Sequence, residues 1–222
     1  MKLIIKFTKL GRIAYISHLD LTRAFLRALR VSGLKPAYSK GFNPHPKMSI
    51  ICPLPLGFES ENELVEVEIE KCDGVASINF LESTKKLNKS LPEGIRILEI
   101  REKGPNEPKS LASHLRWIEY EITSDAVPKN LPEIDLWLQN NIIVNKVNRK
   151  TGIEKEIDIR PMIDCFEIIK KLPNLYIYRC LVSAEPGNTL NPSTLMQAWF
   201  DYNKAGFDPA RIRILRKSFI FE

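Results

Sequence analysis

Two short runs in the first 58 residues hold the side chains best suited to bind an anion or move a proton. The first run is SHLD, where Ser17 and Asp20 have the spacing of a helix capping box and His18 lies between them. In such a box the hydroxyl accepts from the third helical amide, and the acid reaches back to the first. Ser17 and Asp20 are therefore expected to cap a helix. His18 should lie at its solvated start, where free amide groups can also bind a phosphate.

The second run, GFNPHPK, places His45 between Pro44 and Pro46. Proline fixes its own backbone angle and restricts the residue before it, so this loop should be stiff. Gly41 permits an unusual backbone angle, and Phe42 either plugs the loop into the core or stacks on a base. A stiff turn alone explains the prolines, whereas a binding role also explains the polar side chains. The candidate anion-binding residues of this segment are Lys40, Asn43, His45 and Lys47.

A row of arginines, Arg23, Arg27 and Arg30, is spaced to lie along one face of the expected helix, away from its apolar stripe. Residues 1–58 contain ten Lys and Arg residues against one acidic residue, whereas residues 59–108 contain seven against twelve. The net charge of +6 is thus concentrated around the two runs. A charged helix face is usually only solvated, but a local basic excess also suits a polyanionic partner such as nucleic acid.

The elements that must position these side chains follow the order β-α-β-β-α-β. Strands are expected at residues 2–9, 47–54, 62–70 and 95–102, and helices at residues 17–32 and 74–90. The run at 62–70 alternates apolar residues with glutamates, which is typical of a strand with one buried face. Residues 103–111 contain one glycine and two prolines and are the best candidate linker.

A similar order follows this linker. Strands are expected at residues 114–123, 142–148, 155–169, 175–183 and 210–221, and helices at residues 131–140 and 193–204, the second capped by Ser193. The chain is therefore predicted to be an α+β protein of two tandem ferredoxin-like sandwiches, with domains at residues 1–104 and 105–222.

The composition disfavours several classes of protein. The four cysteines, at positions 52, 72, 165 and 180, form no C-x-x-C pair, which predicts reduced core residues rather than a metal or iron–sulfur site. No stretch reaches the roughly 18 apolar residues of a membrane helix. The N-terminal apolar run is interrupted by Lys6 and lacks the pattern of a signal peptide. We therefore expect a cytoplasmic protein with no metal, no cofactor and no membrane partner.

Three segments together resemble a known family: GRIAYISHLDLTRAFLRALR (11–30), YSKGFNPHPKMS (38–49) and LPLG (54–57). They are similar to the bacterial radical SAM-linked proteins, which stand alone or are fused to a B12-type radical SAM domain. The resemblance implies a partner or substrate-handling module of such an enzyme, and it points toward RNA. The motif positions that it implies are Ser17, His18, Asp20, Gly41, Phe42, Pro44 and Pro46.

Three functions stay open at this point. The first is an RNA-binding or substrate-presenting module for a radical SAM enzyme, with tRNA or rRNA as the candidate RNA. The second is a protein scaffold whose basic face docks that enzyme without nucleic acid. The third is a metal-free endoribonuclease that uses His45 or His18 as general acid or base. The chain lacks the closely spaced cysteines of a radical SAM core, so the sequence favours a binding protein over an enzyme and assigns no catalytic residue.

Overall fold

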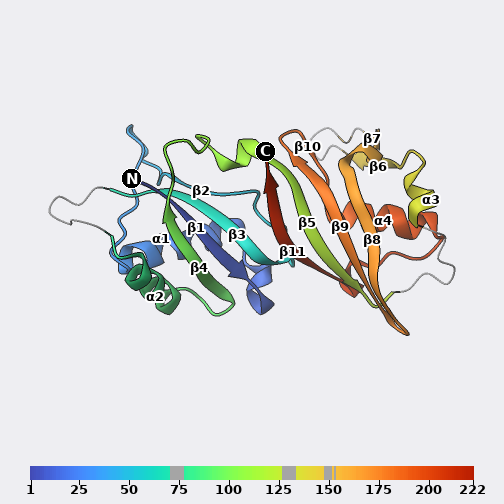
Figure 1. Cartoon of the computed structure of the whole chain (residues 1–222), viewed down its shortest axis with the longest axis horizontal. Coiled ribbons are helices and arrows are strands. Elements are labelled where there is room, and N and C mark those ends of the chain that lie inside the picture. The colour runs from blue at the N-terminus through green and yellow to red at the C-terminus, as the bar shows by residue number, and fades with distance from the viewer. Residues whose placement is uncertain (71–77, 127–133, 148–151, 153) are drawn as a thin grey trace. The chain divides into compact units, whose positions relative to one another are not determined.

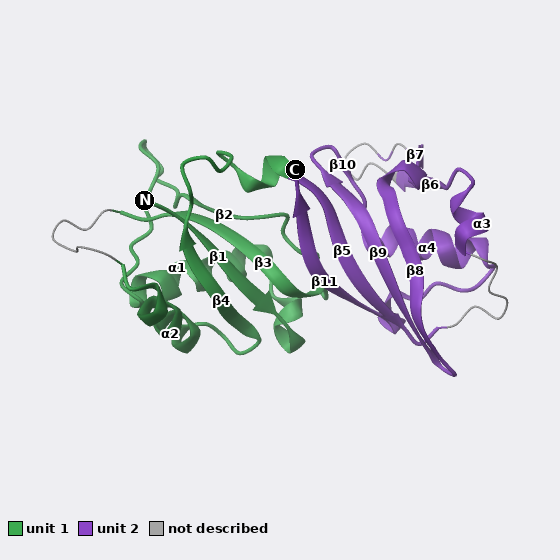
Figure 2. Ribbon diagram, viewed as in Figure 1, with its two compact units in different colours: residues 1–114 green, residues 115–222 purple. Residues whose placement is uncertain are grey.

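The computed structural model describes the chain except for residues 71–77, 127–133, 148–151 and 153. The chain divides into two compact units, unit 1 (residues 1–114) and unit 2 (residues 115–222), which are coloured separately in Figure 2. The predicted domain limit lies after residue 104, and residues 105–114 group with unit 1 in this division.

Unit 1 follows the order β-α-β-β-α-β (Figure 1). Its strands are β1 (Lys2–Lys9), β2 (Met48–Ile50), β3 (Glu59–Glu68) and β4 (Ile95–Glu102). Its helices are α1 (His18–Val31) and α2 (Phe80–Ser90), with short 3-10 turns at η1 (Gly11–Tyr15) and η2 (Leu111–His114). Every pairing is antiparallel and gives the strand order β4-β1-β3-β2, which is that of a ferredoxin-like sandwich.

The core of unit 1 joins one face of its sheet to both helices. Alternate residues of β1, such as Phe7, share a buried apolar cluster with Phe25 of α1 and Leu87 of α2. The rings of Phe7 and Phe25 meet edge to face, with centroids 4.7 Å apart. The alternation predicted for β3 places Val65 and Val67 in the same cluster. The position of α1 is therefore fixed by its apolar stripe, and its polar face is left to solvent.

Unit 2 has the same strand order with one insertion. Its main elements are β5 (Leu115–Ser124), α3 (Ile134–Leu138), β8 (Ile163–Leu172), β9 (Leu175–Glu185), α4 (Pro192–Tyr202) and β11 (Ile212–Phe221). These strands pair antiparallel in the order β11-β5-β9-β8. The insertion is a hairpin of β6 (Ile143–Val147) and β7 (Glu154–Asp158) between α3 and β8, and the short β10 (Asn188–Thr189) pairs with β9. The predicted α+β class is confirmed.

The core of unit 2 is rich in aromatic side chains. Trp199 of α4 is completely buried, and its ring centroid lies 5.0 Å from that of Trp137 in α3. Phe166 of β8 stacks on Tyr178 of β9 at 5.6 Å. Burial raises the pKa of the Tyr178 phenol to about 12. All three tryptophans of the sequence, Trp117 included, belong to this unit.

Two predicted elements of unit 2 were wrong in detail. The run at 155–169 is not one strand, because the 3-10 turn η3 (Arg160–Met162) separates β7 from β8. Pro161 within this turn has no amide hydrogen to give to a strand ladder. Helix α4 begins at Pro192, and its N-cap is Asn191 rather than Ser193, since proline suits the first helical position. A further turn, η4 (Pro209–Arg211), precedes β11.

Other predicted boundaries differ by smaller amounts. Strand β2 is shorter than residues 47–54, and α2 begins at Phe80 after the N-cap Asn79. The N-terminal parts of the predicted helices at residues 74–90 and 131–140 include residues that the structure does not describe. The prediction of core cysteines is confirmed for Cys180, whereas Cys52 and Cys165 are only half-buried. The fourth, Cys72, lies outside the described residues.

Candidate nucleic-acid interface

The start of α1 has the cap that the sequence predicts. Ser17 is the N-cap residue, and its hydroxyl accepts from the Asp20 amide at 3.1 Å. The Asp20 carboxylate accepts from the Ser17 hydroxyl at 2.7 Å and from Arg23 Nη1 at 3.1 Å. The sequence predicted instead that this carboxylate would accept from the first amide. The Ser17 hydrogen bond, followed by that of Arg23, holds the pKa of Asp20 below its usual value. His18 is exposed at the first helical position.

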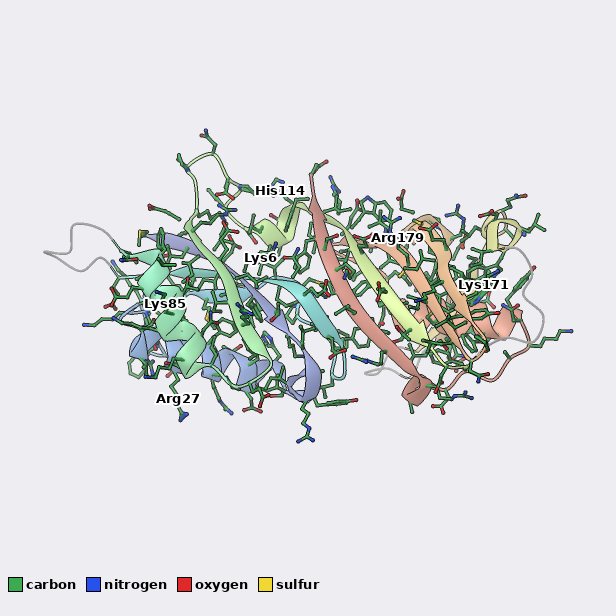
Figure 3. The ribbon with its side chains drawn as sticks, turned by 60° about the horizontal axis from the view of Figure 1, so that its bottom comes forward. Lys6, Arg27, Lys85, His114, Lys171 and Arg179 are labelled. Carbon is green, nitrogen blue, oxygen red and sulfur yellow. The ribbon has the colours of Figure 1, made fainter. Side chains whose placement is uncertain are left out.

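The three arginines of α1 are exposed, as predicted, but their surroundings differ. Arg23 is paired with Asp20. Arg30 donates to the hydroxyl of Tyr38, and its guanidinium carbon lies 6.0 Å from the centroid of that ring. Figure 3 shows Arg27 extending away from α1, and it has no ion-pair partner within the described part of the chain. Arg27 is therefore the arginine of α1 that is most available to a ligand.

Residues 39–47, named here the Phe42 loop, are closed at their base by main-chain contacts. The Ser39 amide donates to the His45 carbonyl at 2.8 Å, and the His45 amide donates to Ser39 Oγ at 2.9 Å. Just before the loop, Tyr38 forms a β-bridge with Pro46. These bonds cross-link the two sides of the loop and, with Pro44 and Pro46, restrict the conformations that it can adopt.

The end of β3 holds both stems of the Phe42 loop. The Ala37 amide donates to the Glu68 carbonyl at 2.7 Å, and the Glu68 amide donates to the Lys47 carbonyl at 2.9 Å. Lys47 Nζ also donates to the Glu68 carboxylate at 2.9 Å, which lowers the pKa of Glu68. Lys47 was predicted to bind an anion, but its charge is already partly balanced by Glu68. Its firmest role is to fix the loop to the sheet.

The tip of the Phe42 loop presents a different set of groups. Phe42 is completely exposed, so it does not plug into the core. Lys40, Asn43 and His45 are exposed beside it. Gly41 has a φ of 136°, a backbone angle that residues other than glycine rarely adopt. An aromatic ring surrounded by a cation, an amide and an imidazole can stack on a nucleobase and contact the neighbouring phosphates.

The SHLD run and the Phe42 loop are not brought together. Helix α1 has 14 residues, so its ends are about 21 Å apart. Ser17 and His18 stand at its start, whereas Arg30 at its end contacts Tyr38 in the stem of the Phe42 loop. His18 and His45 therefore cannot share one phosphodiester. Neither imidazole is given a carboxylate partner among the residues that the structure describes. This arrangement lends no support to the endoribonuclease alternative.

Two residues of this interface escaped prediction from the sequence. Tyr38 lies in the segment that carries the family resemblance, but nothing in the spacing linked its hydroxyl to Arg30. Glu68 belongs to the acidic alternation of β3, which predicts a solvated strand face rather than a partner for Lys47. The count of basic residues in 1–58 therefore overstates the charge available to a ligand, since Asp20 pairs with Arg23 and Glu68 pairs with Lys47.

Within the described ranges, no group of three or more His, Cys, Asp or Glu side chains is arranged to hold a metal ion. None of the described helices has both the length and the apolar character needed to cross a bilayer.

The fold and this surface define an α+β protein with a basic, aromatic-tipped loop. The chain belongs to the DUF2344 family, described as an uncharacterized protein conserved in bacteria, which matches residues 2–192. No curated protein matches the sequence.

Two solved structures align with nearly the whole chain, both at low TM-scores. The first is a chain of an H/ACA ribonucleoprotein bound to a substrate RNA containing 2'-deoxyuridine, with 10% identity and a TM-score of 0.47. That alignment covers 97% of this chain but 47% of the other, so this chain spans about half the length of that protein. The second is a putative glycine cleavage system transcriptional repressor, with 11% identity, a TM-score of 0.24 and coverage of 100% and 98%.

Proposed function

We propose that this protein binds single-stranded RNA through the Phe42 loop and presents it to a partner enzyme. The single observation that supports this proposal is Phe42 itself. It is a fully exposed aromatic ring on a loop that proline residues and main-chain bonds hold in one shape. A large apolar side chain gains nothing by facing water, so its position at the tip of an ordered loop suits a contact with a ligand.

The chemistry of the tip favours nucleic acid over an apolar protein surface. Every base has a flat face, and stacking on an aromatic side chain contributes about 1–3 kcal/mol per base. Lys40 beside Phe42, and Arg27 on α1, carry cations that can approach phosphates. Asn43 adds an amide that can hydrogen-bond a base edge or a sugar hydroxyl.

The compensated charges limit how strongly the surface depends on electrostatics. Arg23 and Lys47 are paired with acids, and Arg30 already donates to Tyr38, so Arg27 and Lys40 are the main phosphate contacts in this proposal. Two such contacts correspond to a slope of log affinity against log salt of roughly −1 to −2 for single-stranded RNA. Binding should therefore weaken with salt but persist through stacking.

The partner enzyme in this proposal is a radical SAM enzyme. This part rests on the resemblance of the sequence motifs, because the chain itself lacks the cysteines of a radical SAM core. Candidate RNAs are tRNA and rRNA. Purification of the protein from its own cells, with sequencing of retained RNA and identification of retained proteins, tests the assignment. Recovery of the enzyme without any RNA, even at low salt, would transfer the function to protein docking.

The direct test is fluorescence anisotropy with a labelled, unstructured oligouridylate. Phe42→Ala is expected to weaken binding by about tenfold or more, since it removes the stacking face, whereas Phe42→Tyr should bind as the wild type does. Leu81→Ala is the matched control, because Leu81 is also an exposed apolar residue but lies on α2. Equal affinity of the Phe42→Ala variant and the wild type would refute the proposal.

One observation favours protein docking as a second candidate. Tyr15, Leu19 and Leu56 are large apolar side chains with 75%, 65% and 64% of their surface exposed. The Gly57 amide donates to the Ala14 carbonyl at 3.0 Å, which brings Leu56 to the turn that carries Tyr15. Leu19 lies in the first turn of α1, close along the chain. Exposed apolar clusters of this kind commonly mark protein interfaces.

This second candidate is separable from the first by mutation. Leu19→Arg should abolish capture of a co-expressed radical SAM enzyme and leave oligouridylate binding unchanged. Phe42→Ala should have the reverse effect. If Leu19→Arg leaves the capture intact, the cluster around Leu19 is not the docking surface.

A further inference from the structure

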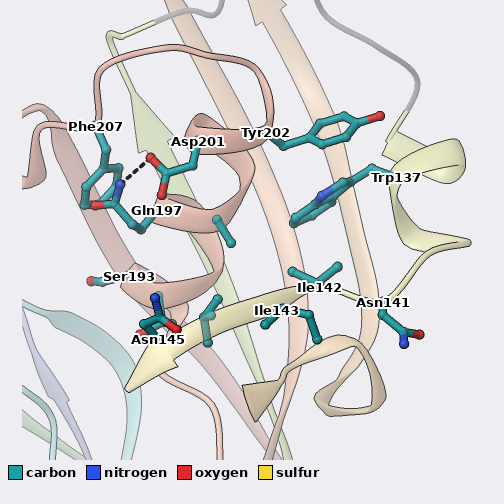
Figure 4. Close-up of a pocket in the computed structure, with 13 residues that line it drawn as sticks. Trp137, Asn141, Ile142, Ile143, Asn145, Ser193, Gln197, Asp201, Tyr202 and Phe207 are labelled. Atoms are coloured by element: carbon teal, nitrogen blue, oxygen red, sulfur yellow. Dashed lines mark hydrogen bonds between the residues drawn. The ribbon is translucent and has the colours of Figure 1, made fainter. Parts of the chain in front are cut away.

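Unit 2 contains a cleft of about 730 Å³ between α4 and β6 (Figure 4). Its size lies within the range of small-molecule sites in proteins, which is about 300–1,000 Å³. Ala198 in the middle of the α4 wall has a small side chain that leaves room above it. This site was not predicted from the sequence, because its two walls come from segments far apart along the chain.

One side of the cleft is aromatic. Trp137 lines it from α3, and the centroid of Tyr202, at the end of α4, lies 6.0 Å from the Trp137 ring. Trp199 packs against Trp137, and the centroids of the two rings are 5.0 Å apart. Tyr202 is about half exposed, whereas Trp137 is almost completely buried. Tyr202 is therefore the ring on which a flat ligand can stack, and Trp137 forms the rigid inner side of the cleft.

The other groups of the cleft are polar and lie at helical spacing. Ser193, Gln197 and Asp201 follow one another at intervals of four along α4, which places them on one face of the helix. Gln197 Nε2 donates to Asp201 Oδ1 at 2.7 Å, as the dashed line in Figure 4 marks. This bond fixes the amide, so that its oxygen and the second carboxylate oxygen of Asp201 are acceptors for a ligand. Asn145 of β6 adds both a donor and an acceptor.

The charges of the cleft limit the class of ligand. Among the lining residues that the structure describes, Asp201 is the one carboxylic acid, and none is Lys, Arg or His. Among these described residues, a phosphate would meet a carboxylate without a compensating cation. A neutral, flat ligand with an amino group would instead stack on Tyr202 and donate to Asp201.

We propose that this cleft binds the base of an uncharged nucleoside and prefers bases whose exocyclic amino group can donate to Asp201. Adenosine, cytidine and guanosine carry such a group, whereas uridine presents carbonyl oxygens in its place and would face the carboxylate with an acceptor. The same chemistry fits a free nucleoside or an unpaired base within RNA. The site lies in unit 2 and does not depend on the function proposed for the Phe42 loop of unit 1.

Titration of the full-length protein with adenosine, cytidine, uridine and adenosine monophosphate tests the proposal. Binding is followed by calorimetry and by quenching of tryptophan fluorescence, since Trp137 lines the cleft. Adenosine and cytidine are expected to bind, and uridine to bind at least tenfold more weakly, because a donor to a charged acceptor is replaced by an acceptor. Equal affinity for uridine, or tighter binding of the monophosphate than of adenosine, would overturn the proposal.

Two variants locate the binding. Ala198→Leu fills the cleft and should abolish adenosine binding, provided that its thermal unfolding matches the wild type. Asp201→Asn keeps the shape of the side chain and should weaken adenosine by about tenfold while it reduces the discrimination against uridine. Adenosine binding that survives both substitutions would place the ligand elsewhere and refute the site.

A third variant separates the two proposals of this protein. Phe42→Ala is expected to leave adenosine binding unchanged. If the wild-type protein binds adenosine but not oligouridylate, the cleft proposal stands and the RNA-binding proposal fails. If it binds oligouridylate but not adenosine, the RNA-binding proposal stands and the cleft proposal fails. A short RNA with one unpaired adenosine then distinguishes the sources: its binding should respond to Asp201→Asn only if the cleft takes a base from RNA.

Discussion

The two units share a strand order and differ most at one connection, the segment between the first helix and the second strand of each sheet. In unit 1 this segment runs from residue 32 to 47 and carries the Phe42 loop between α1 and β2. In unit 2 it runs from residue 139 to 162 and contains the β6–β7 hairpin between α3 and β8 (Figure 1). Unit 1 turns an aromatic ring outward from this connection, whereas unit 2 uses the connection to build one wall of a cleft beside a buried ring.

The difference shows how one scaffold can carry two kinds of site. A stiff loop with few contacts beyond its base suits a partner that comes to it, such as an RNA strand with bases to stack. A hairpin that encloses space against α4 suits a small ligand that enters. In both cases the sheet and its helices supply a fixed base, and the proposed site lies in the connection added to it.

The largest effect expected from this contrast concerns stability. Trp137→Ala removes an almost fully buried ring from the wall of the cleft and should lower the free energy of unfolding by about 3–5 kcal/mol. Phe42→Ala should change it by about 0.5 kcal/mol or less, since the ring makes no buried contact to lose. Urea unfolding followed by far-ultraviolet circular dichroism measures both. A loss of several kcal/mol in Phe42→Ala would mean that the ring packs on the protein, and the contrast would fail.

A smaller effect tests whether the segment after β4 is part of unit 1. Glu107 accepts from Arg101 Nη1 and Nη2, each at 2.7 Å, and from the Gly104 amide at 2.6 Å. These bonds, that of Arg101 first, lower the pKa of Glu107 to about 2. The ionised form therefore favours the folded state above the unfolded pKa of 4.5, and this contribution is lost as the pH falls from there through about 2.

Glu107→Gln should accordingly cost about 1 kcal/mol at pH 7, a figure reduced for the partial exposure of the ion pair. The stability difference between wild type and variant should shrink steadily in urea unfolding between pH 4.5 and pH 2. A difference that stays constant over this range would show that the bonds of Glu107 do not contribute to folding.

Local signals made much of unit 1 predictable from the sequence. Strand β4 was placed at residues 95–102, as observed, because apolar and charged residues alternate there. The Ser17 cap was found because the capping box spans four consecutive residues. The contacts of Glu68 with Lys47 and of Arg30 with Tyr38 join positions that no local pattern relates. The cleft of unit 2 was missed for the same reason, although the spacing of Ser193, Gln197 and Asp201 was a signal that could have suggested a polar helix face.

The stiffness of the Phe42 loop predicts a moderate effect on RNA affinity. Pro44→Ala and Pro46→Ala should each weaken oligouridylate binding by about two- to fivefold, because each proline removes conformations that the free loop would otherwise lose on binding. Pro186→Ala is the matched control, since Pro186 is an exposed proline in a turn of unit 2. Unchanged affinity in both loop variants would show that main-chain bonds alone hold the loop. The prolines would then not reduce the conformational entropy that the loop loses on binding.

The smallest effect compares two arginines on the same helix. Arg27→Gln should reduce the salt dependence of RNA binding by about 0.7 in the slope of log affinity against log salt, the value for one phosphate contact on a single strand. Arg23→Gln should change the slope much less, because Asp20 already pairs with Arg23 at 3.1 Å. Asp20→Asn releases Arg23 and should make the slope steeper, toward that of a surface with one more available cation. Anisotropy titrations at several potassium chloride concentrations measure all three slopes. If Arg23→Gln and Arg27→Gln reduce the slope equally, the ion pair with Asp20 does not hold Arg23 back from the RNA, and the basic face would bind as the uniform row of arginines that the sequence predicts.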